Sequence, residues 1–354
     1  MRLAATCRSA AAVWAIGAAL FAGSVLFVLA AGEIGLRAWR WMEPLSEHNP
    51  TGARTTWVAP DPDLGYRLRP NPQRMIHADG LVGPPVDPTS SRFRILVLGD
   101  SVIFGRDNII SRAAEILSRD PAVAPLDFLN SGVPGYTNYQ QVTFLKRSGV
   151  RFKPNLVGIV FVMNDLHRFL HAPQFDGDMA VGQTFWDRSI PGDTNPVLAR
   201  LMAYSLFVAW VHSRVRAAFG LLRVKMGNAY TFDHNPDFRT AWDDNAWKTV
   251  DSQISEAAAL GKQAGFRLFL VAVPFGEQLR ADYLARDAAY VTKPQRRLRE
   301  ICSRLGIAYL DVMPLLDRRR HLQTDFIHLT NEGKTVVAQA LAEFLKKEQL
   351  IPAR

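Results

Sequence analysis

The chain has 354 residues, of which 48% are hydrophobic and 21% are charged, values that are ordinary for a globular protein and exclude a disordered one. The net charge of +9 comes from scattered Lys and Arg, and the one basic run, Arg318-Arg319-Arg320, is short. We therefore expect solvated surface charge and no nucleic-acid partner. The two cysteines, Cys7 and Cys302, form no CxxC pattern, so neither a disulfide framework nor a cysteine metal site is expected.

The first predicted element is a charge-free stretch of 24 residues from Ser9 to Gly32. As a helix it would reach roughly 36 Å, enough to cross a hydrocarbon core of about 30 Å. This predicts a cytoplasmic tail over 1–8 and a transmembrane anchor over 9–32, with the remainder of the chain on the periplasmic side of the inner membrane. A cleaved signal peptide is the alternative, because Val28-Leu29-Ala30 suits a cleavage site.

Residues 33–92 are predicted to form a segment that wraps onto the following domain. Nine prolines lie between 44 and 88, and they favour irregular structure over a repeating element.

From 93 to 350 the pattern predicts an α/β domain. Short apolar runs, typical of strands buried on both faces, alternate with helical patterns, and this favours a parallel sheet covered on both sides. The runs are Arg94–Leu98, Leu126–Leu129, Leu156–Val162, Arg267–Val273 and Ile307–Val312, and the helical patterns include Asn108–Arg119, Asp243–Ala264 and Pro294–Leu305. A last helix is expected after Thr330, which is a plausible N-cap.

Residues 173–242 interrupt this alternation and are interpreted as an insertion. Within it, Leu201–Val211 is nearly all apolar but too short to span a membrane. A core or cap helix is one interpretation, and a lid or membrane-facing surface is the other. The tryptophans of this region favour aromatic packing over sugar stacking; they are Trp186, Trp210, Trp242 and Trp247.

Two separated motifs carry the parts of an acyl-transfer site. Ser101 follows the first buried strand in Gly99-Asp100-Ser101, and Asp325 precedes His328 by three residues. A serine hydroxyl becomes a good nucleophile when a histidine accepts its proton, and a carboxylate holds that histidine in the required tautomer.

The donors for an oxyanion are expected at two further strand ends. Gly132 follows the second run, where it offers a backbone N–H, and Asn164 ends the third, where it offers its amide. Three strand ends thus deliver three parts to one edge of the sheet.

Together these blocks resemble the SGNH, or GDSL-type, hydrolase family. The matching residues are Gly99-Asp100-Ser101, Gly132, Asn164-Asp165 and Asp325-x-x-His328-Leu329; Asp63–Pro70 is also similar to membrane-anchored bacterial members. The resemblance implies a flavodoxin-like three-layer α/β/α sandwich with a five-stranded parallel sheet. It implies Ser101 as nucleophile, His328 as base and Asp325 as its orienting partner, with Ser101 N–H, Gly132 N–H and Asn164 as the oxyanion hole. Val162 departs from the family pattern, because glycine is common at that position.

The expected function is therefore an esterase that forms an acyl-enzyme on Ser101, acting on an ester-bearing small molecule, glycan or lipid without a cofactor. Transfer of the acyl group to an envelope polysaccharide is one alternative, and a catalytically silent glycan-binding or scaffold protein is another. His167 and His171 have the spacing of metal ligands, but no HExxH pattern accompanies them, and no metal site is predicted.

Overall fold

The computed structural model describes residues 2–42, 57–85, 87, 89–167, 172–176, 179–184, 197–198, 201, 205–225, 230–235, 237–325 and 327–354. Five strands form one parallel sheet in the order β4-β3-β5-β8-β9. The strands are β3 (Phe93–Leu98), β4 (Leu126–Asn130), β5 (Leu156–Val162), β8 (Arg267–Val273) and β9 (Ala308–Asp311). In chain order this is the 2-1-3-4-5 arrangement of flavodoxin-like folds. The predicted five-stranded parallel sheet is confirmed.

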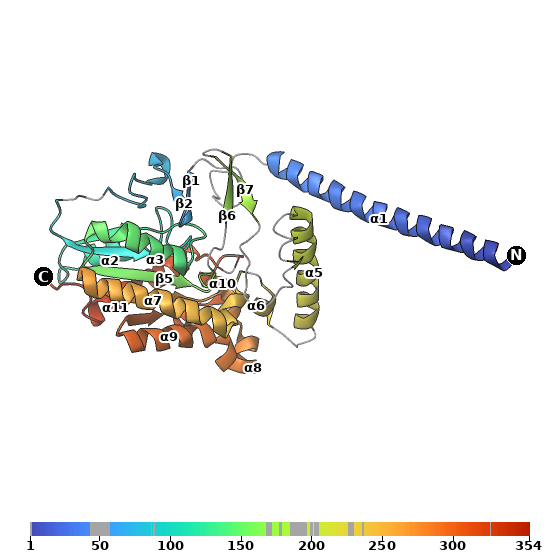
Figure 1. The fold of residues 1–354 in the computed structure, drawn as a ribbon. Coiled ribbons are helices and arrows are strands. Elements are labelled where there is room, and N and C mark those ends of the chain that lie inside the picture. Colours follow the sequence, from blue (N-terminus) through green and yellow to red (C-terminus); the bar gives the residue numbers. More distant parts are fainter. Residues whose placement is uncertain are drawn as a thin grey trace.

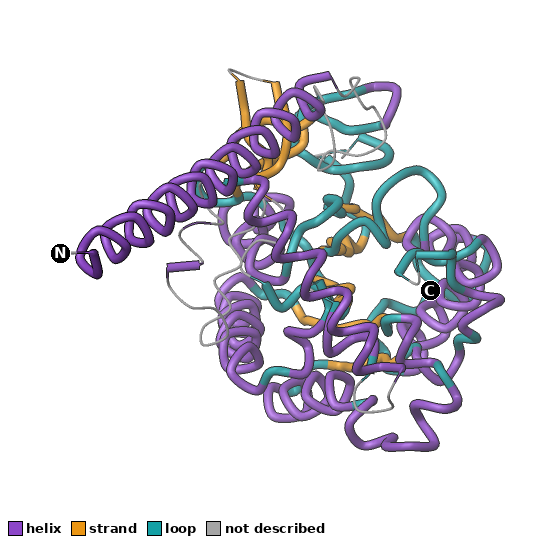
Figure 2. Tube along the Cα trace, turned by 90° about the vertical axis from the view of Figure 1, so that its right-hand side faces the viewer, coloured by secondary structure: helices purple, strands orange, loops and turns teal. Residues whose placement is uncertain are grey.

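Helices cover both faces of the sheet, which gives three layers (Figure 1). One face packs on α2 (Ile109–Ser118) and α11 (Asn331–Lys347), and the other packs on α3 (Asn138–Arg147), α7 (Asp244–Ala264) and α9 (Lys293–Leu305). Side chains of one strand alternate between the two cores: Val160 and Val162 of β5 belong to the first, and Ile159 and Phe161 to the second. Figure 2 looks toward the ends of the strands and shows helices on either side of them.

The helix boundaries follow from local capping. The side chains of Asn108, Asp243 and Thr330 accept backbone N–H groups in the first turns of α2, α7 and α11, and so satisfy donors that have no partner within the helix. Gly265 and Gly306 end α7 and α9 with φ of 80° and 67°, a conformation that glycine adopts without strain. The three helices predicted between the strands, and the N-cap at Thr330, are confirmed.

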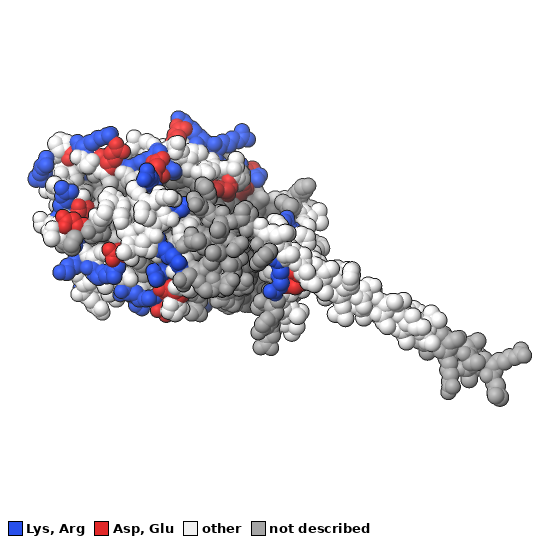
Figure 3. Space-filling view, turned by 90° about the horizontal axis from the view of Figure 1, so that it is seen from above, with Lys and Arg blue, Asp and Glu red and all other residues white. Residues whose placement is uncertain are grey.

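The N-terminal helix α1 (Arg2–Met42) is longer than the anchor predicted over 9–32. It contains one stretch long and apolar enough to cross a membrane, Ala12–Trp39. The helix continues past Gly32, where Glu33 and Arg37 pair one turn apart at 2.7 Å, and the anchor bounds 9–32 stay a prediction. In Figures 1 and 3, α1 projects from the domain as a rod whose described middle part carries no charged residue, whereas the domain surface carries mixed charge.

Residues 57–92 do fold onto the domain, but they are not wholly irregular. They contain an antiparallel hairpin of β1 (Val58–Asp61) and β2 (Gly65–Leu68). Its turn is fixed by the Asp61 carboxylate, which accepts the N–H groups of Asp63 and Leu64 at 3.0 and 2.9 Å. Tyr66 is fully buried and donates its hydroxyl to the Pro134 carbonyl at 2.6 Å. Two short strands thus form in spite of the prolines, and their apolar residues are part of the core.

The described parts of the insertion contain a second hairpin and two helices. These are β6 (Ala172–Asp176), β7 (Met179–Thr184), α5 (Leu206–Lys225) and α6 (Thr231–His234). Of the helix considered over Leu201–Val211, residue 201 and residues 206–211 are helical, and α5 extends beyond it from Leu206 to Lys225. Trp242 and Trp247 stack on Phe232 and Phe161, as the packing interpretation predicts. Trp210 stacks on Phe207 but is 39% exposed, and Trp186 lies outside the described residues.

The remaining named helices of the described chain are short or lie between the elements above. They are α8 (Ala281–Val291), α10 (Arg318–His321) and the 3-10 turns Pro72–Arg74, Gly149–Phe152, Arg239–Trp242, Gly276–Leu279 and Met313–Leu315.

Gly158 of β5 makes a specific contact possible in the centre of the sheet. It pairs with Phe269 of β8, and a Cβ at position 158 would lie 2.2 Å from that ring. We expect Gly158→Ala to lower the free energy of unfolding by about 1–3 kcal/mol through overpacking. Thermal melting of the full chain in detergent measures this.

The control is Phe269→Leu, alone and combined with Gly158→Ala. Because the smaller side chain gives the new methyl group space, the double variant should lose less than the sum of the two single losses. An unchanged melting temperature for Gly158→Ala would contradict the close packing.

Candidate active site

The polar residues singled out in the sequence meet at the carboxyl edge of the sheet, the edge at which its parallel strands end. Ser101 follows β3, Gly132 follows β4 and Asn164 follows β5. The strand order reverses between β3 and β5, and ligands of open α/β sheets bind outside such a reversal. His328 reaches the same edge from the loop before α11.

Ser101, His328 and Asp325 form a continuous hydrogen-bonded chain. His328 Nε2 lies 2.9 Å from Ser101 Oγ, and His328 Nδ1 lies 2.6 Å from Asp325 Oδ2. A carboxylate only accepts hydrogen bonds, so Nδ1 carries the proton and Nε2 is left to accept the serine proton. This arrangement can generate a serine nucleophile.

Asp325 is fixed by the turn that it starts. Its Oδ1 accepts the backbone N–H groups of Ile327 and His328 at 2.9 and 3.0 Å, while Oδ2 holds the imidazole. Partial burial raises the pKa of Asp325, but the hydrogen bonds from the His328 ring and from the two N–H groups outweigh it, and the net pKa is lowered. Asp325 is thus more readily ionised than an ordinary aspartate and can accept the hydrogen bond from His328 Nδ1 as an anion.

The loop that carries His328 is closed by backbone pairing. Leu322 and Leu329 form an antiparallel bridge, and Gln323 N–H donates to the His328 carbonyl at 2.8 Å. Thr330 then caps α11 and donates its hydroxyl to the Arg320 carbonyl. The histidine is therefore held on a short hairpin that leads directly into a packed helix.

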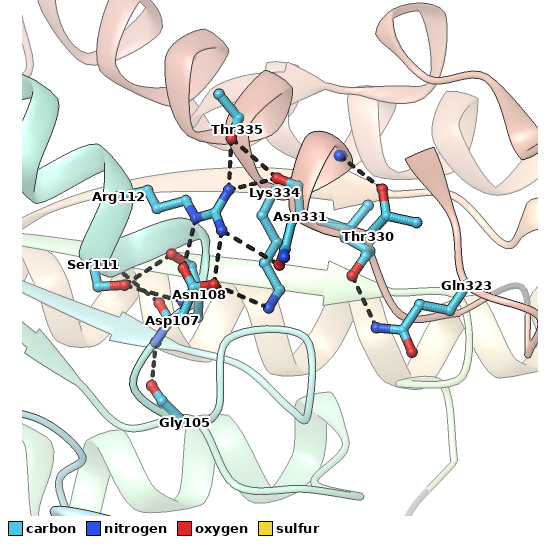
Figure 4. Close-up of polar contacts among 12 residues, drawn as sticks. Gly105, Asp107, Asn108, Ser111, Arg112, Gln323, Thr330, Asn331, Lys334 and Thr335 are labelled. Atoms are coloured by element: carbon cyan, nitrogen blue, oxygen red, sulfur yellow. Dashed lines mark hydrogen bonds and ion pairs between the residues drawn. The ribbon is translucent and has the colours of Figure 1, made fainter. Parts of the chain in front are cut away.

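A polar cluster ties this hairpin to the serine loop (Figure 4). Arg112 of α2 donates to both carboxylate oxygens of Asp107 at 2.6 and 2.7 Å, and to Thr335 Oγ1 at 2.6 Å. Its guanidinium also donates to the backbone carbonyl of Asn331, the first residue of α11. Arg112 thus joins the loop after Ser101 to the helix that follows His328.

Asn164 lies in the turn that follows β5. Its side chain is buried, and within the described part of the chain its Oδ1 has no hydrogen-bond partner. Val162 causes no distortion of this turn, because its N–H donates to Asp165 Oδ2 at 3.1 Å and its side chain is buried in the core. The departure from the family pattern therefore leaves the Asn164 turn intact.

Gly132 lies closely against the serine loop. A Cβ at this position would be 2.6 Å from the Ile103 side chain and 3.1 Å from the Asp100 carbonyl, so the approach requires glycine. Its N–H already donates to Asn130 Oδ1 at 2.8 Å. An oxyanion at Gly132 would therefore have to share this N–H with the Asn130 side chain. The sequence analysis did not single out Asn130, although the Asn-x-Gly spacing is typical of such a turn.

Two buried carboxyl groups lie next to the site residues in the chain: Asp100 precedes Ser101, and Asp165 follows Asn164. Asp100 Oδ1 accepts the Val102 N–H at 2.9 Å, and Asp165 Oδ2 accepts from Gln141 at 3.0 Å. Burial raises the pKa of Asp165 well above its usual value, and the charge of Asp100 adds to this. Burial also raises the pKa of Asp100, against its hydrogen bonds and the attraction of His328. Both residues belong to the sequence motifs described above, but the motifs predict no role for them.

His167 belongs to a packing contact. Its Nε2 lies 3.1 Å from both the Asp237 carbonyl and Thr240 Oγ1. His171 lies outside the described residues, so the suggested metal spacing is not tested.

No protein-family model matches this chain, and no curated protein matches it by sequence. Among solved structures it is similar to a lipase/acylhydrolase from Enterococcus faecalis, with a TM-score of 0.41 and 13% identity over 74% of this chain and 98% of that one. It is also similar to a catalytic mutant of Axe2, an acetylxylan esterase from Geobacillus stearothermophilus, with a TM-score of 0.43 and 13% identity over 73% and 96% of the chains. It is similar to TesA as well, with a TM-score of 0.42 and 15% identity over 72% of this chain and 98% of that one. Similarity at this level assigns no activity to this chain. The activity proposed below rests on the side-chain geometry instead.

The raised pKa of Asp165 predicts a pH dependence of stability. Because the folded state holds this proton above the ordinary pKa of 3.8, stability falls as pH rises from that value toward the folded pKa, by about 1.4 kcal/mol per unit of difference. Asp165→Asn keeps an acceptor for Gln141 and Val162 but has no proton to lose. Its melting temperature should gain on that of the original chain between pH 4 and 8, whereas parallel curves would show that Asp165 does not titrate there.

Arg112 is expected to act as a positioning residue. Arg112→Gln should slow phosphonylation of Ser101 by a fluorophosphonate by about 10- to 100-fold, because a small displacement between serine and histidine weakens the nucleophile. The matched control is Arg119→Gln at the other end of the same helix, where the arginine pairs with exposed Glu115. Equal labelling rates for the two variants would contradict this role.

Proposed function

We propose that this protein is a membrane-anchored serine esterase that hydrolyses an acyl ester on the outer side of the membrane. The observation that carries the proposal is the chain of two hydrogen bonds, 2.9 Å and 2.6 Å long, from Ser101 through His328 to Asp325. The position of Asn164 directly after β5, the strand that neighbours β3, supports it.

Each residue has one role in the proposed reaction. Ser101 Oγ attacks the ester carbonyl carbon while His328 Nε2 takes its proton, and the negative charge moves to the carbonyl oxygen. Asn164 and backbone N–H groups stabilise that oxygen. The ester C–O bond then breaks, the leaving alcohol takes the proton from His328, and an acyl-enzyme remains.

A water molecule completes the cycle. His328 takes a proton from water, the hydroxide attacks the acyl carbon, and the bond to Ser101 Oγ breaks as the serine regains a proton. Asp325 stays ionised throughout and stabilises the imidazolium that forms twice in the cycle. A sugar hydroxyl in place of water would make the same machinery an acyltransferase; product analysis with water and an oligosaccharide in competition separates the two.

The membrane location rests on α1. Its apolar window Ala12–Trp39 is unburied by the rest of the chain, so a membrane is the environment that suits it. Arg2 and Arg8 precede the apolar stretch, and basic residues favour the cytoplasmic side, so we assign the domain to the periplasmic side.

The experiment is hydrolysis of a short-chain nitrophenyl ester by the full chain in detergent. Ser101→Ala should lower kcat by roughly 10⁴-fold or more. Asn164→Ala should lower it by about 10²- to 10³-fold, since it removes one oxyanion donor. Ser118→Ala, at the exposed far end of α2, is the matched control and should be fully active. Unchanged turnover by Ser101→Ala would refute the proposal.

A further inference from the structure

Helix α5 leaves a row of large apolar side chains uncovered. Val215, Phe219 and Leu222 are 50%, 65% and 53% exposed, and Val211 lies one turn before them. Residues at this spacing lie along one face of a helix, so the four form a single apolar stripe. A soluble surface rarely carries such a contiguous row without something that covers it.

The charge on α5 suits a membrane surface. Its 20 residues contain no acidic residue and four basic ones, Arg214, Arg216, Arg223 and Lys225. Arg214 and Arg223 are exposed, and their positions on the helical wheel fall on either side of the apolar stripe. Basic residues that flank an apolar face are typical of helices that lie in the interface of an anionic bilayer.

The start of α5 is fixed to α1 at a defined level. Glu33 accepts a hydrogen bond from Ser205 Oγ at 2.8 Å and another from the Phe207 N–H at 3.0 Å. The Phe207 ring packs so closely on Gly32 that a Cβ there would lie 2.4 Å from it. Gly32 is the last residue of the charge-free stretch of α1, so this junction marks where that stretch would leave the hydrocarbon core.

The direction of α5 completes the picture. In Figure 1 α5 begins near the domain end of α1 and runs away from it at a steep angle, on the side of the domain from which α1 projects. A helix that leaves a transmembrane segment steeply at its point of exit lies near the plane of the membrane surface. The strand β5 points toward this same side, so the carboxyl edge with Ser101 also faces it.

We infer that α5 is a second membrane contact: an in-plane helix whose stripe of Val211, Val215, Phe219 and Leu222 enters the outer surface of an anionic bilayer. The contact turns the carboxyl edge of the sheet toward the lipid. It uses the anchoring by α1 described above but does not depend on the chemistry of Ser101.

Depth-dependent fluorescence quenching tests this in the full chain, reconstituted into phosphatidylglycerol-containing nanodiscs. An environment-sensitive NBD dye is attached to single cysteines in a Cys7→Ser background; Cys302 is fully buried, and burial raises its thiol pKa to about 12, so it reacts slowly. The sites are Phe219→Cys on the stripe, Phe21→Cys in α1 and Glu343→Cys on the exposed face of α11. Lipids with a doxyl quencher at a shallow or deep position report the depth.

The dye at 219 should be blue-shifted and quenched more by the shallow than by the deep label, consistent with a depth of about 5–10 Å. The dye at 21 should respond to the deep label and the dye at 343 to neither. Replacing Arg214 and Arg223 by Gln, or phosphatidylglycerol by phosphatidylcholine, should weaken the signal at 219.

A dye at 219 as water-exposed as that at 343, while the dye at 21 is quenched, would overturn the inference and leave the anchor intact. A blue-shifted dye at 219 that no lipid label quenches, and that changes with the protein-to-lipid ratio, would also overturn it, because a second copy of the chain then covers the stripe. Loss of quenching at 21 would instead contradict the anchor.

Discussion

The hydrogen bond between Ser101 and His328 joins two loops that are 227 residues apart in the chain. Neither loop has a reason to lie near the other until the parallel sheet has formed. The sheet brings the ends of β3 and β5 to one edge, and the packing of α2 against α11 brings the hairpin that carries His328 to the same place. The proposed chemistry depends on that single convergence.

The support for this convergence comes from polar groups that form no bond to the substrate in the proposed reaction. Arg112 fastens the serine loop to α11, and the turn of Asp325 fixes the imidazole through the backbone as well as the side chain. Asp100 and Asp165 are buried in a low-dielectric environment, in which it is unfavourable for both carboxyl groups to be ionised. The site thus combines a well-hydrogen-bonded anion at Asp325 with a strongly disfavoured one at Asp165.

Much of this arrangement could be predicted from the sequence, because apolar runs in a parallel sheet and N-caps such as Thr330 leave clear local signals. The pairing of Ser101 with His328 was predicted from the Gly-Asp-Ser and Asp-x-x-His motifs and the family resemblance, since only Ser101 directly follows a strand. What the sequence did not reveal depends on long-range contacts. The Arg112 cluster joins residues from both halves of the chain, the Gly132 N–H is engaged by a neighbouring side chain, and the hairpin at Val58–Leu68 was hidden by its prolines. The charge-free stretch marked the apolar part of α1 but not its full length, because the helix continues through the pair of Glu33 and Arg37.

The central claim is that Ser101 is a nucleophile activated by His328, and a trapped acyl-enzyme tests it most directly. The full chain is mixed with an excess of a nitrophenyl ester, quenched in acid within milliseconds and analysed by intact and peptide mass spectrometry. The account predicts one acyl group on the peptide that contains Ser101, and none in His328→Ala over the same time. An unmodified Ser101 in a folded protein, or an acyl group on another residue, would contradict it.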